Sequence, residues 1–241
     1  MFLHEIEITG RSTAKDIVAA NYRTSDVFRK YGIEYCCGAG WPLSNVCAMK
    51  GIDEKQLIEA LQLASRHLEQ PSLLDYNKWQ VEFLSQYILN VHHGYLKKAL
   101  PPLRRELKLF VKEHASKYPY TVSLESKFEK LYEKLISLLK YEEQVIFPDI
   151  LQSVVGLHEM PTSESRSYQS RTAPFFSALQ PEYRQITDAL IEIRLLTFNY
   201  TPPGNACTSH RVVLAKLKEL DINISQQIYL ERDVLFSRVC N

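Results

Sequence analysis

Apolar side chains recur in steps of three and four along residues 124 to 145. This period is typical of a helix that buries one face in a core. The stripe passes through Glu142, and a carboxylate at such a position costs roughly several kcal/mol unless it is paired, protonated or bound to a metal. We therefore expect a partner for Glu142 inside the protein. The apolar members of the stripe are Leu124, Phe128, Leu131, Leu135, Leu138 and Val145.

The same pattern returns 89 residues later, so that Glu142 corresponds to Glu231 and Leu138 corresponds to Gln227. A second pair of segments repeats with an offset of 90, which pairs His93 with Tyr183. Two similar helical hairpins that face each other make a four-helix bundle. We predict such a bundle, a duplicated helical hairpin, over residues 76–241. Six positions should lie at comparable heights in it: His93, Leu138, Glu142, Tyr183, Gln227 and Glu231.

The first 70 residues show shorter apolar patterns, which predict a small helical domain over residues 1–70. Ser12 or Thr13 and Asp53 stand where they can cap helices, and Gly32 stands where it can end one. Residues 70–72, Gln-Pro-Ser, break the pattern and predict the domain boundary. With only 8 glycines and few alternating segments, the whole chain is predicted to be all-α.

Two interruptions of the bundle pattern need an interpretation. Pro101 and Pro102 predict a kink rather than an end, because the apolar stripe continues beyond them. From residue 148 to about residue 174 the chain turns polar and rich in serine. We expect a long exposed loop there, between the two hairpins.

Composition excludes several classes of protein. The 29 basic and 28 acidic residues nearly balance, so we expect neither a nucleic acid nor an anionic membrane as a partner. The sequence contains no apolar run of about 20 residues, which a membrane-spanning helix needs, and its start does not have the pattern of a signal peptide. Five cysteines without the spacing of a disulfide scaffold indicate a reducing cytoplasm.

Cys36 and Cys37 lie in a glycine-rich segment that predicts a tight turn. One interpretation is a redox or metal-handling pair. Adjacent cysteines are strained when they bridge each other, so exchange with Cys47 or with an outside partner is easier. The other interpretation is two small buried hydrophobic residues beside a turn. Cys207 and Cys240 are expected to be packing or surface residues.

His93, Glu142 and Glu231 form the second candidate site. Imidazole and carboxylate ligands suit iron, manganese or zinc, and two carboxylates from opposite helices can bridge a pair of ions. The alternative is a buried hydrogen-bond network in which Glu142 and Glu231 share a proton.

Several segments resemble a known family, the iron–sulfur cluster repair proteins (repair of iron centres). Residues 26–38, DVFRKYGIEYCCG, with Cys47 and residues 51–53, are similar to the small N-terminal domain of that family. The later part resembles the family's hemerythrin-like domain. The matching segments are residues 142–148 (EEQVIFP), His93 before Leu100-Pro101, Pro202-Pro203 before Ala206-Cys207, and Glu231 before residues 234–236.

The resemblance implies a cytoplasmic protein with a non-haem di-iron centre that restores iron–sulfur clusters after nitrosative or oxidative damage. It also implies damaged iron–sulfur proteins as partners and a possible homodimer. The family's centre uses four histidines and two glutamates, of which His93, Glu142 and Glu231 are retained here. The other three histidine positions hold Leu138, Tyr183 and Gln227. Among these, tyrosine can bind ferric iron as a phenolate.

Two hypotheses follow. The chain is a metalloprotein of cluster repair or of the nitric-oxide response, with an altered site made of His93, Tyr183, Glu142 and Glu231. Alternatively, it is a metal-free interaction or regulatory protein that keeps the fold and uses Cys36 and Cys37 or its surface. In neither case do we expect a conventional enzyme.

Overall fold

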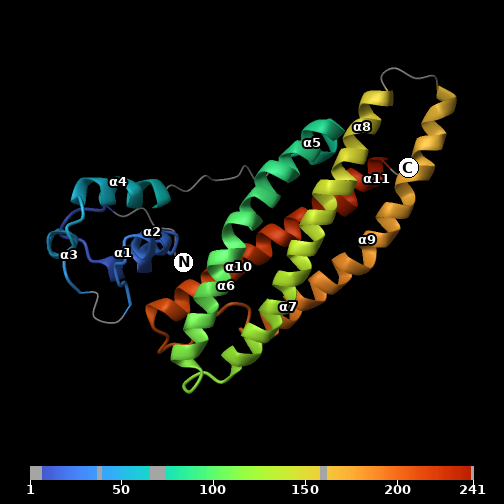
Figure 1. Ribbon diagram of the computed structural model, residues 1–241. Helices are drawn as coiled ribbons and strands as arrows, with labels where there is room; N and C mark the ends of the chain where they lie inside the picture. The colour runs from blue at the N-terminus through green and yellow to red at the C-terminus, as the bar shows by residue number, and fades with distance from the viewer. Residues whose placement is uncertain (1–6, 37–39, 66–73, 158–161, 240–241) are drawn as a thin grey trace. The chain divides into compact units, whose positions relative to one another are not determined.

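The computed structural model describes residues 7–36, 40–65, 74–157 and 162–239, and every regular element in these ranges is a helix (Figure 1). The prediction of an all-α fold, with a helical N-terminal region followed by a bundle of long helices, is confirmed. The chain divides into two compact units. The first unit comprises residues 1–72 and 200–217, and the second comprises residues 73–199 and 218–241.

Four short helices lie in the first unit, and their ends follow local sequence signals. The Thr13 side chain accepts a hydrogen bond from the Asp16 N–H (3.2 Å), and the Asp53 carboxylate accepts one from the Gln56 N–H (3.0 Å). Gly32 follows the second helix with φ at +63°, a conformation that favours glycine. The four helices are α1 (Ala14–Ala20), α2 (Thr24–Lys30), α3 (Leu43–Lys50) and α4 (Glu54–Ser65).

A segment from far along the chain completes the core of this unit. Val212, in the first turns of α10 (Thr208–Tyr229), is buried in the same apolar cluster as Ile17 and Phe28. Lys216 of the same helix lies 2.5 Å from a carboxylate oxygen of Asp26. The sequence pattern assigned residues 1–70 alone to the small domain, because periodicity within a segment carries no information about distant partners.

The second unit is built on four helical runs. A short 3-10 turn, η1 (Tyr76–Lys78), precedes them. Three of the runs contain an internal π-helical segment. The runs are α5 (Val81–Tyr87), η2 (Ile88–His93) and α6 (Gly94–His114); α7 (Tyr120–Tyr141), η3 (Glu142–Ile146) and α8 (Phe147–Leu157); α9 (Thr162–Leu196); and the later part of α10 with η4 (Leu230–Leu235) and α11 (Phe236–Val239).

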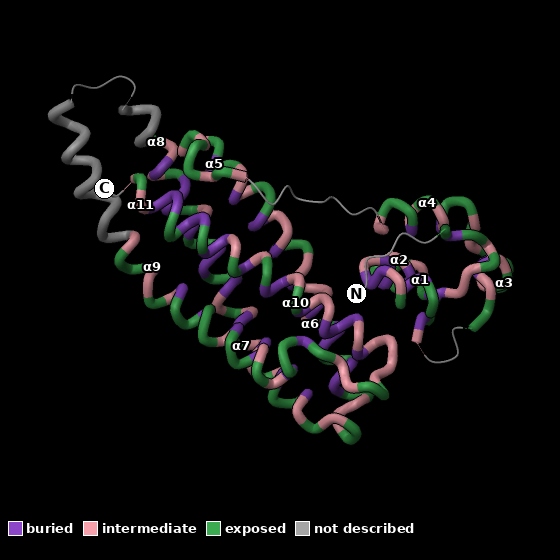
Figure 2. Tube along the Cα trace, turned by 180° about the vertical axis from the view of Figure 1, so that it is seen from behind, coloured by how far each residue is buried: buried purple, intermediate pink, exposed green. Residues whose placement is uncertain are grey.

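The core of the second unit is the set of apolar stripes that face one another between the runs, seen as buried positions along the inner sides of the helices in Figure 2. α7 packs against both α6 and α9. Burying one leucine or phenylalanine side chain stabilises the fold by about 1.5–3 kcal/mol. The stripes include Leu96, Leu100, Leu103, Leu107, Leu124, Phe128, Leu131, Leu135, Leu179, Ile186, Leu190, Ile193, Leu220 and Ile224.

The structure differs from the sequence pattern in one long stretch. The loop predicted over residues 148–174 is wrong where the structure describes it, since α8 extends to Leu157 and α9 begins at Thr162; residues 158–161 lie outside the described residues. Serine inside a helix costs only about half a kcal/mol relative to alanine, so a polar composition does not by itself end a helix. In the first run, α6 continues through Pro101 and Pro102, as the apolar stripe predicted.

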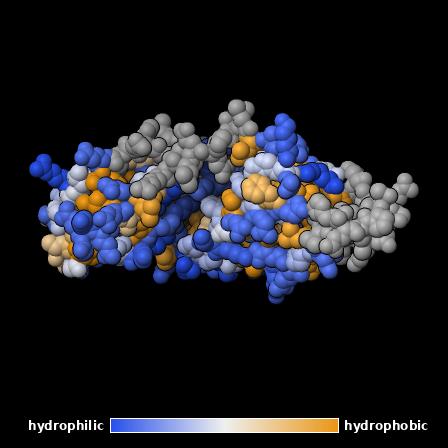
Figure 3. All heavy atoms as spheres, turned by 90° about the horizontal axis from the view of Figure 1, so that it is seen from above, coloured by the Kyte–Doolittle hydropathy of each residue, from blue (hydrophilic) through white to orange (hydrophobic). Residues whose placement is uncertain are grey.

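Hydrophobic side chains are interspersed with hydrophilic ones over the face seen in Figure 3. Large apolar side chains that are exposed include Leu195 and Phe198 near the end of α9. Among the described residues, no helix has the length and apolar character needed to cross a membrane.

Candidate functional site

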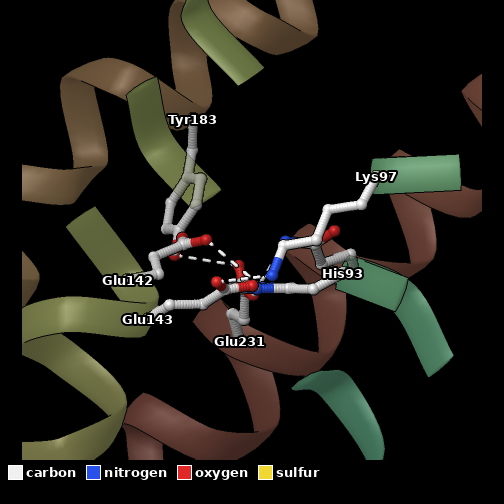
Figure 4. A network of polar contacts seen from close by, with 7 residues as sticks. His93, Lys97, Glu142, Glu143, Tyr183 and Glu231 are labelled. Atoms are coloured by element: carbon white, nitrogen blue, oxygen red, sulfur yellow. Dashed lines mark hydrogen bonds and ion pairs between the residues drawn. The ribbon is translucent and has the colours of Figure 1, made fainter. Parts of the chain in front are cut away.

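Four polar side chains from four helical runs meet in the core of the second unit (Figure 4). His93 is the last residue of η2, Glu142 is the first residue of η3, and Glu231 lies in η4. Tyr183 comes from α9. A π-helical segment fits an extra residue into one turn and is frequent at functional sites. Here each π-helical segment delivers one ionisable side chain to the same buried point.

Tyr183 joins the two carboxylates on one side of the site. Its hydroxyl oxygen lies 3.1 Å from Oε1 of Glu142 and 3.0 Å from Oε2 of Glu231. A phenol has a single proton to donate. One of these two contacts is therefore a hydrogen bond donated by Tyr183, and the other is satisfied when the carboxyl group itself carries a proton.

His93 faces the two remaining carboxylate oxygens. Its Nε2 lies 3.4 Å from Oε2 of Glu142 and 3.4 Å from Oε1 of Glu231. The Oε2 atom of Glu142 is fully buried and has no hydrogen-bond partner among the described residues. The three side chains offer one nitrogen and two oxygen atoms that lie within 4.8 Å of one another. This is a suitable arrangement for a single bound cation or a shared proton.

A third carboxylate, that of Glu143, orients the imidazole through its other ring nitrogen. Oε1 of Glu143 lies 3.0 Å from Nδ1 of His93, and Oε2 of Glu143 accepts a hydrogen bond from Nζ of Lys97 at 2.6 Å. When Nδ1 donates its proton to Glu143, the lone pair of Nε2 points at Glu142 and Glu231. Histidines that bind metals commonly donate their other ring N–H to a carboxylate in this way.

The electrostatics of the site follow from burial. Loss of solvent and the neighbouring Glu231 raise the pKa of the Glu142 carboxyl well above its ordinary value. Burial and the same two carboxylates raise the pKa of Tyr183 well above its ordinary value, so the phenol keeps its proton. Burial opposes the shift at Glu143, but hydrogen bonds from Lys97 and His93 lower the pKa of that carboxyl.

Leu138 and Gln227 lie one helical turn before Glu142 and Glu231, as the repeat predicted. Leu138 is buried and offers no ligand atom. The Gln227 amide nitrogen donates a hydrogen bond to Oε1 of Glu231 at 3.0 Å. These two side chains therefore fill space or hold a carboxylate, and neither brings a second nitrogen ligand to the site.

The structure separates the cysteines into different settings. Cys36 is half-buried, and Cys37 lies outside the described residues, as does Cys240. Cys47 is buried, and its burial raises the pKa of the thiol. Cys207 is half-buried as well, and its thiol interacts with the thiol of Cys36, a pairing that the sequence pattern did not predict.

Sequence reasoning missed Glu143 and Lys97 as parts of the site. Their signal was present, since Lys97 follows His93 by one helical turn and Glu143 follows Glu142 directly. A regular α-helix would turn Glu143 about 100° away from Glu142. In the structure Glu142 and Glu143 both contact His93, and the π-helical segment η3 begins at Glu142.

The chain is similar to proteins of one kind along most of its length. A family model described as a domain of unknown function (DUF542, ScdA_N) matches residues 11–65. The iron-sulfur cluster repair protein YtfE of Escherichia coli is 31% identical over 216 residues, which cover 90% of each chain. The iron-sulfur cluster repair protein ScdA of Staphylococcus haemolyticus is 24% identical over 241 residues, which cover 96% of this chain and 99% of the relative.

Proposed function

The chain belongs to the family of the iron–sulfur cluster repair proteins, and from this premise we propose that it takes part in repairing damaged iron–sulfur clusters. Its partners would then be iron–sulfur proteins damaged by nitrosative or oxidative stress. We propose further that its own buried centre takes one metal ion rather than two. The observation that supports this is the convergence of His93 Nε2 with the carboxylates of Glu142 and Glu231.

A two-iron centre, which the hemerythrin-like class implies, does not fit these side chains. Two ions need more ligands than one imidazole and two carboxylates supply. The positions that would add nitrogen ligands hold Leu138 and Gln227, and the Gln227 amide already donates to Glu231. The Tyr183 hydroxyl contacts both carboxylates, but its raised pKa disfavours the phenolate that binds ferric iron.

A single divalent ion fits better. Iron, manganese and zinc all accept imidazole nitrogen together with carboxylate oxygen. Two positive charges would neutralise Glu142 and Glu231 and provide a partner for the buried Oε2 of Glu142. His93 would supply the neutral nitrogen, with its tautomer fixed by Glu143. Such an ion supplies Lewis acidity or, if it is iron, one-electron chemistry.

A second candidate function has its own support. The Tyr183 hydroxyl closes a hydrogen-bonded chain between the two carboxylates when Glu142 is protonated, and the raised pKa of Glu142 favours that form. In this state a proton replaces the cation. The protein would then be a metal-free member of the family that acts by interaction or regulation.

Metal analysis separates the two candidates. We expect protein purified from iron-supplemented cells, and metal-free protein titrated with ferrous iron, to bind one ion per chain. The variants Glu142→Gln and Glu231→Gln should lose this binding while keeping their helical content. Two irons per chain would contradict the single-ion proposal, and no binding of iron, manganese or zinc would favour the metal-free candidate.

The repair function needs a separate assay. An iron–sulfur hydratase inactivated by nitric oxide should recover activity when the protein is added with a thiol reductant and iron. Recovery equal to that seen with iron and reductant alone would contradict a repair function. If the Glu142→Gln variant promotes recovery as well as the unmodified protein does, repair does not use the buried centre.

A further inference from the structure

Cys36 stands at a well-anchored point of the first unit. The N–H of Ile33 donates a hydrogen bond to the carbonyl of Phe28 (2.8 Å), and Ile33 itself is buried. The next aromatic residue, Tyr35, is also buried, and its hydroxyl accepts a hydrogen bond from the Arg29 guanidinium at 2.6 Å. These contacts hold the chain up to Cys36, whose side chain remains partly accessible.

Cys207 lies immediately before α10, and backbone contacts on this side hold it in place. Its carbonyl accepts the N–H of Arg211 at 3.2 Å. The Arg211 guanidinium donates to the carbonyls of Ala206 and Gly204, both at 3.3 Å, which fixes the loop in front of the helix. The backbone N–H groups of Ser209 and His210 donate to the Cys207 thiol.

The two thiols are in contact although they are 171 residues apart in the sequence. Both belong to the first unit, so one compact body holds them together. Two further contacts fasten the same turns of α10 to this body, namely Val212 in the apolar core and Lys216 on Asp26. The juxtaposition of the cysteines is therefore part of the packing of the unit.

We propose that Cys36 and Cys207 form a thiol–disulfide redox site that exchanges with low-molecular-weight disulfides such as oxidised glutathione. In the first step the Cys36 thiolate attacks one sulfur of the small disulfide, forms a mixed disulfide and releases one small thiolate. Cys207 then attacks the Cys36 sulfur and releases the second small thiolate. The protein loses two thiol protons and two electrons, and the small disulfide is reduced to two thiols.

The order of attack follows from the environment of the two sulfurs. Burial, with the neighbouring Cys36, raises the pKa of the Cys207 thiol, although the amides of His210 and Ser209 oppose this shift. Cys207 therefore rests as a thiol, which disfavours it as the first nucleophile, because the thiolate is the attacking form. Cys36 attacks first, and Cys207 resolves the mixed disulfide.

Cys47 does not fit either role. It is 2% exposed and packed in the apolar core of the first unit. Burial, with Glu54 and Asp53 nearby, raises the pKa of its thiol. A small disulfide cannot reach such a sulfur without opening the core, so Cys47 provides a reference for an inert cysteine.

The full-length protein tests the proposal directly. After incubation with oxidised glutathione, two of its five thiols should disappear. Tryptic digestion without reduction should yield residues 31–50 joined to residues 195–211, and treatment with a thiol reductant should separate the two peptides. Failure of the unmodified protein to give this linked peptide, while glutathione modifies other cysteines, would overturn the proposal.

Because residues 31–50 contain three cysteines, variants are needed to identify which of them forms the disulfide. Cys36→Ser should abolish the linked peptide, and the matched control Cys37→Ser should leave it intact. Cys207→Ser should instead accumulate glutathione on Cys36 on the order of 10-fold above the unmodified protein, since the neighbouring thiol no longer resolves it. Loss of the linked peptide in Cys37→Ser, together with its persistence in Cys36→Ser, would show that Cys36 does not form the disulfide. Unchanged helical circular dichroism is required of each variant.

Discussion

Oε1 of Glu143 lies 3.0 Å from Nδ1 of His93, and this contact decides which ring nitrogen faces the buried carboxylates. Lys97 holds the other oxygen of the same carboxylate at 2.6 Å, so the group that orients the histidine is itself fixed. Glu143 is partly exposed, whereas His93 is fully buried. Glu143 and Lys97 thus set the orientation of the buried imidazole from the more exposed side of the site.

The first prediction concerns this orienting carboxylate. Glu143→Gln keeps the shape of the side chain but removes the negative charge that accepts the Nδ1–H of His93 and orients the ring. We expect the affinity of metal-free protein for zinc or ferrous iron to fall about 10- to 100-fold. Isothermal titration at fixed pH measures the change.

A matched control lies on the same helical run. Glu129 accepts hydrogen bonds from Arg104 and is paired with Lys108, so it too is a carboxylate with two cationic neighbours. Glu129→Gln should leave metal affinity unchanged. If both variants weaken binding equally, the effect is one of general charge and the orienting role of Glu143 is wrong.

The second prediction concerns the Tyr183 hydroxyl. Tyr183→Phe leaves the fully buried oxygens of Glu142 and Glu231 without their shared donor. We expect the free energy of unfolding of the metal-free protein to fall by about 1–3 kcal/mol, which urea denaturation measures. The control Tyr229→Phe removes a hydroxyl from a residue that is 44% exposed and should change stability by less than about 0.5 kcal/mol. Equal stability of Tyr183→Phe and the unmodified protein would contradict the bridging role.

Much of this architecture was predictable because the buried positions of a helix recur in the sequence with the helical period. The steps of three and four along residues 124–145, and their return 89 residues later, predicted the facing positions of Glu142 and Glu231. Helix boundaries followed where capping chemistry is local, as at Thr13 and Gly32. What the stripe predicts is the side of a helix that faces the core.

The remaining features depend on contacts that no local pattern encodes. A π-helical turn such as η3 changes the backbone hydrogen bonding without changing the composition, so the approach of Glu143 to His93 was missed. The pairing of Cys36 with Cys207 arises from tertiary packing of α10 into the first unit. The loop predicted over residues 148–174 failed because polar composition was mistaken for the absence of a helix.

The third prediction is a pH dependence. Burial and the nearby Glu231 raise the pKa of Glu142, so the folded protein keeps a proton that the unfolded chain has already released. Stability of the metal-free protein should therefore fall as the pH rises from about 4.3, the unfolded value, toward the raised folded value. Glu142→Gln cannot release this proton, so its stability should fall less steeply, by up to about 1.4 kcal/mol per pH unit.

Urea denaturation at several pH values between about 5 and 7 tests this difference. Glu129→Gln serves as the control, and its profile between about pH 5 and 7 should run parallel to that of the unmodified protein. Hydrogen bonds from Arg104 lower the pKa of Glu129, so this carboxyl stabilises the fold above the unfolded pKa and loses that effect as the pH falls. Parallel pH profiles for Glu142→Gln and the unmodified protein would show that Glu142 is ionised in the folded state.

The last prediction restores nitrogen ligands to the centre. Leu138 precedes Glu142 by one helical turn, and Gln227 precedes Glu231 in the same way, so a histidine at each position would lie beside a carboxylate. The double variant Leu138→His and Gln227→His should bind two irons per chain, where the unmodified protein binds one. Metal analysis gives the stoichiometry, and the oxo-bridged absorption of a di-iron centre gives an independent signal.

The control variant Leu135→His with Ile224→His places two histidines on the same buried stripes, seven positions before each glutamate, and should bind no additional iron. A second iron in the control, or none in the double variant when its helical content is unchanged, would show that the missing histidines do not set the metal count.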